Sequence, residues 1–575
     1  MIEHGPFVLI ADVRLDNRVE LASELDIPRE TLGKYSDSRI LFEALLKWGR
    51  DAPQQLVGEF AFALWNSETQ NLLLGRDIFG FRPLHFYRCE KFIALATMPS
   101  GLHAIAAIPR EVDVDFVIDS LALIPHTGTH TYFRHIERVE PAHIVEISGT
   151  DIVRTRYWRP NRATVKASPG EFEAGLRDVL SLAVKSQLRG AGSVLASHLS
   201  SGLDSAIVTG TAARLFNPGK VVALTAVPRA DFDGPVPHGR LANEGALAAT
   251  TSRLHPNVTH IEISPEGASP LEALDREHYF QQQPIANLCN ATWGRRINEA
   301  AKAEGATVLL TGSAGNMSIS YSGLEAFAEL IGNGNLLAAL RLARKAANNG
   351  VSWLTIAGSA FGPYLPRSLW SFAKRITGRN FKLADYSSVN PERISSLEHK
   401  AKASGFDFAY RPRRSAFDVR TWSLARTDGG QYFKGVLAEW GLSVRDPTAD
   451  RRVVEYCLSV PAEEFIRDGV PRSLARRAFL DRISTEVAEN PLSGYQSADW
   501  YEAMEQDIST IRAEADAIAS SSLASQAIDG PWLKDSLKSW PPWDLASERT
   551  VTRYRWGALR ALAAGHFIRK VAGEN

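Results

Sequence analysis

Short apolar runs and polar turns make up the chain from residue 7 to about residue 156. An apolar run opens at residues 7–10, residues 59–65 alternate apolar positions, and residues 72–77 follow after a polar turn, which together predict β-strands. One helix is predicted at residues 38–48, where apolar residues recur at helical spacing behind the capping candidate Ser36. The first part of the chain is therefore predicted to be rich in β-structure.

A different pattern begins after a polar, proline-bearing stretch at residues 161–169. An amphipathic run comes first, and short apolar strands then alternate with helical stretches at 193–198, 205–216, 221–227, 244–254 and 259–263. A further buried strand is predicted at 306–310, and after about residue 322 the pattern is mainly helical. Alternation of this kind indicates βαβ units and a parallel sheet. We predict a two-domain α/β protein with domains at residues 1–160 and 170–575.

Charge and cysteine content narrow the class of protein. Basic and acidic residues number 65 each, so the whole chain has no electrostatic attraction to nucleic acid or anionic lipid. Cys89, Cys289 and Cys457 lack metal-ligand spacing, which fits a reducing cytoplasm. With no signal-type segment and no apolar run long enough to span a bilayer, we expect a cytoplasmic protein that binds neither nucleic acid nor membrane.

A local basic segment stands apart from this balance. Residues 367–382 are basic, with Trp370, Phe372 and Phe381 interleaved. This pattern fits either a solvated amphipathic helix or a peptide-docking face.

The motif that points to chemistry lies between a predicted strand and a predicted helix. Small residues at such a junction let backbone N–H groups close on an oxyanion, while the helix offers its positive end. Asp204 in this turn is a candidate ligand that would hold Mg²⁺ against phosphate oxygens. The candidate ATP-binding residues of the motif are Leu199, Ser200, Ser201, Gly202, Leu203, Asp204 and Ser205.

This motif resembles the pyrophosphate-binding loop Ser-Gly-Gly-Leu-Asp-Ser of enzymes that split ATP into AMP and pyrophosphate, with Ser201 in place of the first glycine. Residues 58–65 and 76–84 resemble the glutaminase domain of asparagine synthetases. Thr311 and Gly312 resemble that family's second nucleotide-site loop. The resemblance covers nearly the whole chain. It implies an N-terminal Ntn-hydrolase-like αββα domain and a C-terminal ATP-pyrophosphatase-type domain with a large helical extension.

Three longer stretches, at residues 311–321, 441–452 and 494–500, are similar to lasso peptide cyclases, a branch of that family. These enzymes join the amino terminus of a peptide to one of its own acidic side chains. The branch resemblance implies a peptide substrate, a leader peptidase and a leader-binding protein. It also nominates Glu455 as a base for the amine and Arg445 as a second catalytic residue. A solvated helix carboxylate is the alternative interpretation of Glu455.

The glutaminase half departs from the family pattern. A working glutaminase of this family uses an amino-terminal cysteine as its nucleophile, and here residue 2 is Ile2. The stretch that holds glutamine in the family is replaced at residues 11–13, and the domain begins late relative to its relatives. Either the sandwich is incomplete or the true start lies elsewhere. We predict an inactive domain kept as a scaffold.

The synthetase half departs as well. Asn316 stands where the family carries an acidic Mg²⁺ ligand, and a neutral oxygen donor binds a hard cation more weakly. The lysine that stabilises the leaving phosphate in asparagine synthetases is absent near Gly494. Arg472, Arg476 and Arg477 are candidates to replace it.

The resemblance implies an ATP- and Mg²⁺-dependent ligase that forms an amide through an acyl-adenylate. Macrolactam closure of a lasso peptide precursor is the first hypothesis. An asparagine synthetase or a β-lactam-synthetase-like small-molecule ligase is the second, and an inactive binding scaffold is the third. Retention of Asp204 beside a helix end argues against the scaffold.

Overall fold

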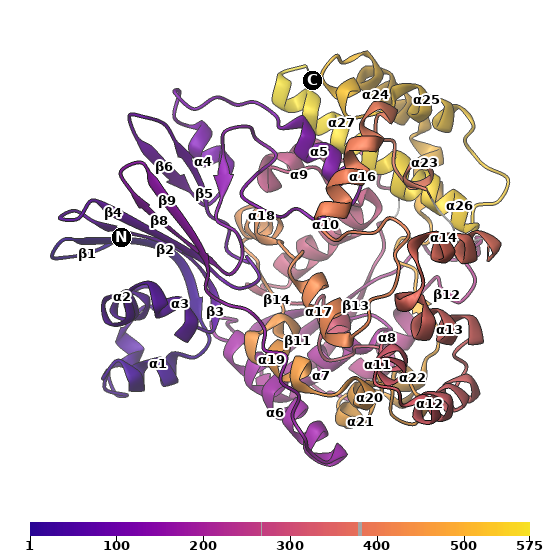
Figure 1. The fold of residues 1–575 in the computed structure, drawn as a ribbon, viewed down its shortest axis with the longest axis horizontal. Helices are drawn as coiled ribbons and strands as arrows, with labels where there is room; N and C mark the ends of the chain where they lie inside the picture. The colour runs from indigo at the N-terminus through magenta and orange to yellow at the C-terminus, as the bar shows by residue number, and fades with distance from the viewer. Residues whose placement is uncertain (266, 378–381, 575) are drawn as a thin grey trace.

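The computed structural model describes residues 1–265, 267–377 and 382–574. Its N-terminal part is built on a six-stranded sheet in which every neighbouring pair is antiparallel (Figure 1). In sheet order the strands are β1 (Ile2–His4), β2 (Phe7–Leu15), β3 (Gly58–Asn66), β4 (Asn71–Arg76), β8 (His143–Ser148) and β9 (Asp151–Arg156).

The two faces of this sheet are covered differently. Helices α1 (Arg18–Glu24), α2 (Asp37–Trp48) and α3 (Ala52–Gln55) pack on one face through an apolar cluster that includes Phe42, Phe60 and Phe62. The other face packs against a three-stranded sheet of β6 (Ile93–Ala96), β5 (His85–Arg88) and β7 (Glu137–Arg138). The alternation seen in the sequence thus serves two cores, one on each side of the sheet.

The second sheet of the molecule is entirely parallel. Its order is β13 (Val258–Ile263), β11 (Lys220–Ala226), β10 (Val194–His198), β14 (Val308–Leu310) and β15 (Ser443–Arg445). One face is covered by α6 (Pro169–Gln187) and α7 (Leu203–Phe216), and the other by α10 (Leu288–Ala303) and α18 (Gly430–Trp440). Helices on both faces bury the central strands, as parallel sheets require, while β13 at the edge stays partly exposed.

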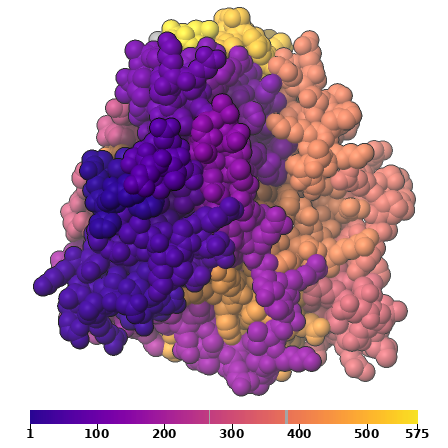
Figure 2. Space-filling view, turned by 60° about the vertical axis from the view of Figure 1, so that its left-hand side comes forward, coloured from indigo at the N-terminus to yellow at the C-terminus, as the bar shows by residue number. Residues whose placement is uncertain are grey.

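The remaining helices surround this sheet and reach back to the N-terminal part. They include α5 (Val114–Leu121), α8 (Gly245–Ser252), α9 (Leu274–Gln281), α11 (Ala326–Gly332), α12 (Leu336–Asn348), α13 (Trp353–Phe361), α14 (Arg367–Ile376), α16 (Ile394–Ala403), α17 (Ala416–Leu424), α19 (Arg451–Ser459), α21 (Ser473–Phe479), α23 (Trp500–Gln506), α24 (Ile508–Ser520), α25 (Gly530–Lys538) and α27 (Leu559–Ala572). One apolar cluster joins α5 to α24 and α27, with Phe116, Tyr132 and Phe567 in it. The N-terminal part therefore shares a core with the C-terminal helices, and Figure 2 shows it pressed against the rest of the molecule.

The predicted fold class, a two-domain α/β protein with a parallel sheet in its second part, is confirmed. Ser36 caps α2 by accepting a hydrogen bond from the Arg39 N–H, as expected. Asn287 caps α10 by accepting a hydrogen bond from the Asn290 N–H. Phe381 of the basic segment lies outside the described residues. None of the helices in the described part of the chain combines the length and apolarity needed to span a bilayer.

Candidate active site

The predicted nucleotide loop joins β10 to α7 at the carboxyl edge of the parallel sheet, where ligands bind in such folds. Side chains within the loop hold its backbone. The Ser200 N–H donates to Ser205 Oγ (3.0 Å), and the Gly202 N–H donates to Ser200 Oγ (3.1 Å). Leu199 and Leu203 are buried beneath the loop and anchor it to the core.

A residue that the sequence did not single out holds the third amide of the loop. Glu244 is buried, and its Oε1 accepts hydrogen bonds from the Ser201 N–H (3.0 Å) and the Ser201 hydroxyl (2.6 Å). Gly494 packs on the same carboxylate so tightly that an added Cβ would come within 2.0 Å of it. Glu244 thus links the nucleotide loop to the segment at Gly494, and the hydroxyl of Ser201 supplies one of its hydrogen bonds.

Asp204 lies in the first turn of α7, and its carboxylate faces the second loop. An added Cβ at Gly315 would lie 2.1 Å from Asp204 Oδ1, so only glycine fits there. Oδ1 is buried and has no hydrogen-bond partner among the described residues. Burial raises the pKa of Asp204 to about 6, although Ser320 and Arg472 lie close enough to lower it. A buried carboxylate oxygen without a partner is what a cation or ligand site requires.

The second loop is held in place by Asp446. Its carboxylate accepts hydrogen bonds from the Ala314 N–H (2.8 Å) and the Thr448 N–H (2.9 Å). Burial raises its pKa to about 6, and Asp204 is near enough to raise it further. Thr311 is buried and donates its N–H to the Arg445 carbonyl (2.9 Å), while Gly312 packs against the backbone of Asp204. The two predicted loops therefore meet at Asp204.

The donor set for a cation is small. Asn316 is exposed in a short 3₁₀ turn, Gly315–Met317, directly after the glycine that faces Asp204. Across the ranges that the structure covers, no group of three or more His, Cys, Asp or Glu side chains is arranged to hold a metal. Mg²⁺ typically takes one or two carboxylates and completes its shell with water and phosphate oxygens. Asp204 and Asn316 fit that requirement only when nucleotide supplies the remaining ligands.

Of the three arginines considered as replacements for the missing lysine, Arg472 is the one whose charge is near enough to lower the pKa of Asp204. Its backbone is left-handed at the N-cap of α21, and its side chain forms no hydrogen bond or salt bridge within the described part of the chain. Arg476 instead binds the Ala488 carbonyl, and Arg477 pairs with Glu173 and Glu464. Arg472 alone among them has its charge available at the nucleotide loop.

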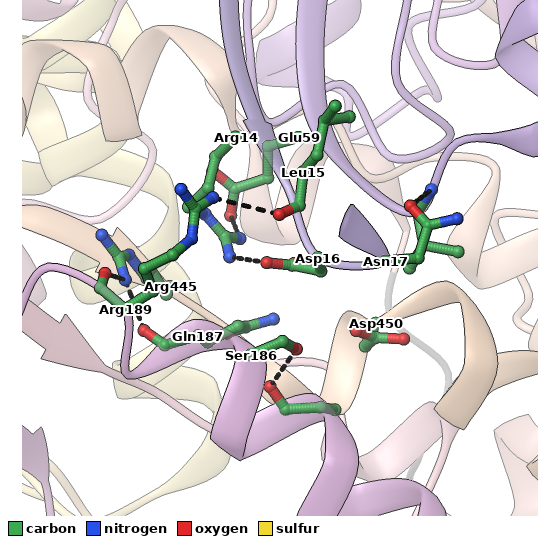
Figure 3. Close-up of polar contacts among 12 residues, drawn as sticks. Arg14, Leu15, Asp16, Asn17, Glu59, Ser186, Gln187, Arg189, Arg445 and Asp450 are labelled. Atoms are coloured by element: carbon green, nitrogen blue, oxygen red, sulfur yellow. Dashed lines mark hydrogen bonds and ion pairs between the residues drawn. The ribbon is translucent and has the colours of Figure 1, made fainter. Parts of the chain in front are cut away.

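The two candidate catalytic residues lie where the two halves of the chain meet. Arg445 is buried and donates to the carbonyls of Gln187 and Arg189 at the end of α6 (Figure 3). Glu455 accepts from the Trp158 indole N–H (2.7 Å) and pairs with Arg451 (2.9 Å). These contacts position the junction and, through the Arg445 carbonyl, the second loop. Catalytic roles for both residues stay predictions.

Ion pairs hold the carboxylates of β2 and β3 in the N-terminal part. Glu59 pairs with Arg14 (2.8 Å) and Arg82 (3.1 Å), and Asp12 pairs with Lys434 of α18 (2.7 Å). Burial alone would raise the pKa of Glu59, but Arg14 and Arg82 outweigh it and hold the pKa below its usual value. No cysteine lies on β1 or β2, where Ile2 stands.

Two cavities open behind the second loop. One of about 400 Å³ is lined by Trp158, Arg159 and Phe417, and a second of about 500 Å³ is lined by Arg367, Arg411 and Arg414 among others. They share Arg413, Asp418 and Trp422. Phe417 and Leu424 of the first cavity pack against Ala314 and Met317 of the second loop. No local sequence pattern predicts these cavities, because their walls come from distant segments.

Comparison with known families assigns both parts of the chain. Residues 1–158 match the glutamine amidotransferase domain family, and residues 175–551 match the asparagine synthase family. Asparagine synthetase [glutamine-hydrolyzing] 3 of Bacillus subtilis (strain 168) is 22% identical over 537 residues, covering 91% of this chain and 81% of that protein.

Other relatives match over shorter stretches. Amidase chry2 of Gibberella zeae is 25% identical over 301 residues, covering 51% of this chain and 44% of that protein. A putative asparagine synthetase [glutamine-hydrolyzing] of Mycobacterium tuberculosis (strain ATCC 25618 / H37Rv) is 27% identical over 238 residues, covering 39% and 36%. The chain thus spans less than half the length of these two relatives. Among solved structures, glutamine phosphoribosylpyrophosphate amidotransferase from B. subtilis aligns with a TM-score of 0.20 at 14% identity, covering 44% of this chain and 61% of that one.

Proposed function

The chain belongs to the asparagine synthase family of carbon–nitrogen ligases, and from this premise we propose that it closes a macrolactam ring in a lasso peptide precursor. In this proposal an Asp or Glu side chain of the peptide is activated by ATP and captured by the amino terminus of the same peptide. The enzyme would release AMP and pyrophosphate.

The observation that carries the ligase chemistry is the environment of Asp204. Its Oδ1 is buried without a partner at the meeting point of the two nucleotide loops, and Arg472 lies beside it. Keeping a charge in such a place is costly unless a ligand completes it. MgATP is the ligand that the family uses and that this donor set fits.

The reaction proceeds in two balanced steps. The substrate carboxylate attacks the α-phosphorus of ATP, which forms the acyl-adenylate and breaks the bond to pyrophosphate. The deprotonated amine then attacks the acyl carbon, the amide forms, and AMP leaves. Mg²⁺ held by Asp204, with Asn316 as a weaker donor, would neutralise charge on the phosphates. Arg472 would stabilise the pyrophosphate as it leaves, and Glu455 is the candidate to take the amine proton.

A substrate that carries its own amine is consistent with the residues found in the N-terminal part of the chain. Ile2 supplies no thiol, and the carboxylates Asp12 and Glu59 are held in ion pairs. The stretch that holds glutamine in the family is also replaced at residues 11–13, so we propose that this part does not supply ammonia. An amine carried by the substrate removes the need for ammonia, so the half can persist as a scaffold.

The sizes of the cavities near the second loop are consistent with a peptide substrate. Volumes of about 400 and 500 Å³ suit a ligand far larger than aspartate. Their shared wall carries Arg413 and Asp418, which would pair with charged side chains or termini of a peptide. A leader peptidase and a leader-binding protein would supply the freed substrate.

A second candidate function follows from the long match to asparagine synthetase 3 of B. subtilis. An asparagine synthetase fed with free ammonia, or a β-lactam-forming ligase, would use the same nucleotide site with a smaller acceptor. An inactive scaffold remains the third reading, and the orphaned carboxylate of Asp204 argues against it.

Mass spectrometry of the purified protein with MgATP and a leader-free precursor peptide tests the proposal. We expect AMP, pyrophosphate and a peptide that has lost one water, all abolished by Asp204→Ala. Aspartate with ammonia runs in parallel, and asparagine formation there, without peptide dehydration, would establish the second candidate instead. If neither substrate set yields AMP, and the wild type binds ATP no better than the Asp204→Ala variant, the inactive scaffold would be favoured.

A further inference from the structure

One segment of this neutral chain carries charge of a single sign. Residues 330–377 contain six lysines and arginines and no acidic residue, although basic and acidic residues are equal in number over the whole chain. The segment forms α11 in part and the whole of α12, α13 and α14. Arg341, Arg344 and Arg375 have no ion-pair partner among the residues that the structure covers.

The same segment exposes apolar side chains at an unusual density. Ten of the 27 exposed large apolar side chains in the described chain lie between residues 336 and 376. On α12, Leu336, Leu337 and Leu340 are 47–69% exposed, while Ala339 and Ala343 face the core. Small residues inside and leucines outside reverse the usual order of a surface helix.

The next helix repeats this arrangement. On α13, Trp353, Leu354 and Phe361 are 56–62% exposed. They lie at spacings of one and eight residues, so they share one side of the helix, and Ile356 and Ala360 take the buried side. Helices α12 and α13 contact each other, so both sets of exposed apolar side chains belong to one pair of packed helices.

The third helix, α14, is amphipathic but buries none of its residues fully. Leu369, Phe372 and Ile376 form one stripe at helical spacing, and all three are more than half exposed. On the inner side, Trp370 packs over Gly362, where an added Cβ would come within 2.8 Å of its ring, and donates its indole N–H to the Ala409 carbonyl. The Trp370 contacts fix the helix and leave the apolar stripe facing outward.

We propose that α12, α13 and α14 form a peripheral docking surface for an anionic lipid bilayer. Figure 1 places the three helices together at the edge of the molecule away from the N-terminal sheet. Outward leucine, tryptophan and phenylalanine side chains with arginine and lysine beside them are the composition of helices that lie in a membrane interface. The basic residues meet the negative lipid headgroups, and the apolar side chains enter the boundary below them.

The sign of the charge on this surface favours an anionic bilayer over a protein as its partner. A protein interface is depleted of charge at its centre and pairs charges of both signs at its rim. Here the segment itself carries only basic charge, and acidic residues from other segments, Asp468 and Asp407, pair with Lys345 and Arg367 alone among its described ion pairs. An anionic bilayer supplies negative charge over any area. The expectation from overall charge, that the chain binds no membrane, is thereby revised for this local surface.

Co-sedimentation with lipid vesicles tests the proposal without any substrate. We expect the full chain to pellet with phosphatidylcholine vesicles that contain phosphatidylglycerol, weakly with phosphatidylcholine alone, and less in high salt. The double change Leu369→Glu and Phe372→Glu should lower the vesicle affinity at least about tenfold, because it removes apolar contact and adds negative charge. Both side chains are exposed in the structure, so the fold should persist.

Two further variants sharpen the outcome. Leu182→Glu places the same change on the exposed side of α6, remote from α14, and should leave vesicle binding unchanged. Arg341→Glu with Arg344→Glu should abolish the preference for phosphatidylglycerol. Equal pelleting of the wild type and the Leu369→Glu, Phe372→Glu variant would overturn the proposal. The proposal would also be overturned if the wild type formed a dimer in solution, or bound an added amphipathic peptide, with no effect of lipid on that association. In that case the association would be lost in the Leu369→Glu, Phe372→Glu variant.

Discussion

Two sets of carboxylates in this molecule differ in their partners: one set is paired with arginines, and the other has an oxygen without a hydrogen-bond partner. In the N-terminal part, Glu59 faces Arg14 and Arg82, and at the junction Asp428 faces Arg76 (2.5 Å) and Arg138 (2.8 Å). Both carboxyl groups have a lowered pKa, because the arginines outweigh the effect of burial. At the nucleotide loops, Asp204 is buried with an orphaned oxygen and a pKa raised to about 6.

The difference separates structure from function. A buried carboxylate with two arginines holds segments together, and removing it leaves uncompensated charge. A buried carboxylate without enough partners destabilises the ligand-free protein, and selection keeps it only where a ligand uses it. By this criterion Glu59 and Asp428 are structural residues, and the loop after β10 is the proposed working site.

The largest effect is expected at Asp204. Replacing it with asparagine should lower the rate of ATP-dependent AMP formation by about 10³-fold, because phosphate charge loses its main counterpart. The same variant should unfold later than the wild type. The rise of the carboxyl pKa from an ordinary 3.8 to about 6 sets an upper bound of about 3 kcal/mol on that gain at neutral pH.

Radiolabelled ATP assays and thermal unfolding measure the two quantities on one preparation. A variant that loses both activity and stability would show that Asp204 is a structural residue like Glu59, and the distinction between the clusters would fail.

Asp428 should behave in the opposite way. Asp428→Asn leaves the guanidinium groups of Arg76 and Arg138 buried without a counter-charge, so unfolding should become easier by about 3–5 kcal/mol. The lowered pKa means that this stabilisation is complete at neutral pH and is lost on acidification. Denaturant unfolding at pH 7 and at acidic pH should therefore show a difference from wild type that shrinks in acid. An unchanged midpoint at pH 7 would contradict the structural role.

Arg472 tests whether a free cation completes the loop. Arg472→Met should lower the turnover number for AMP formation by about 10- to 100-fold, with a change in unfolding free energy below about 0.5 kcal/mol. Arg476→Met is the matched control, because its side chain is already bound to the Ala488 carbonyl. Equal turnover for the two variants would remove Arg472 from the site.

The pH dependence follows from the sign of the Asp204 shift. A carboxyl group with a raised pKa binds more protons in the folded than in the unfolded chain, so its contribution to stability grows as pH falls from about 6 toward 4. Activity should move the other way and decline below pH 6, as the carboxylate is neutralised. Parallel pH profiles of AMP formation and of ligand-free thermal unfolding measure both trends, and Asp204→Asn should flatten the second.

The smallest effect is expected at Glu244. Its carboxylate occupies the Ser201 amide and places a negative charge near the phosphates. Glu244→Gln keeps an acceptor oxygen and removes the charge, so the KM for ATP should fall about fivefold, or about 1 kcal/mol. A rise in KM would mean that the charge positions the loop instead.

The sequence by itself determined the local elements and the chemistry they carry. Short apolar runs indicated the strands, and Ser36 marked the start of the helix predicted at residues 38–48. The loop at Asp204 was found because a phosphate site needs a strand, small residues and a helix end in direct succession.

Only the tertiary structure decided which charges meet. Glu244 lies 43 residues beyond Ser201, and Arg445 binds carbonyls about 256 residues earlier in the chain. Glu455 reaches Trp158 across the junction, and α14 turns its apolar stripe outward because Trp370 holds its other side. Local pattern encodes backbone conformation, which depends on near neighbours. Partners of buried charges and the exposure of a helix face depend on how distant segments pack, and no periodicity records that.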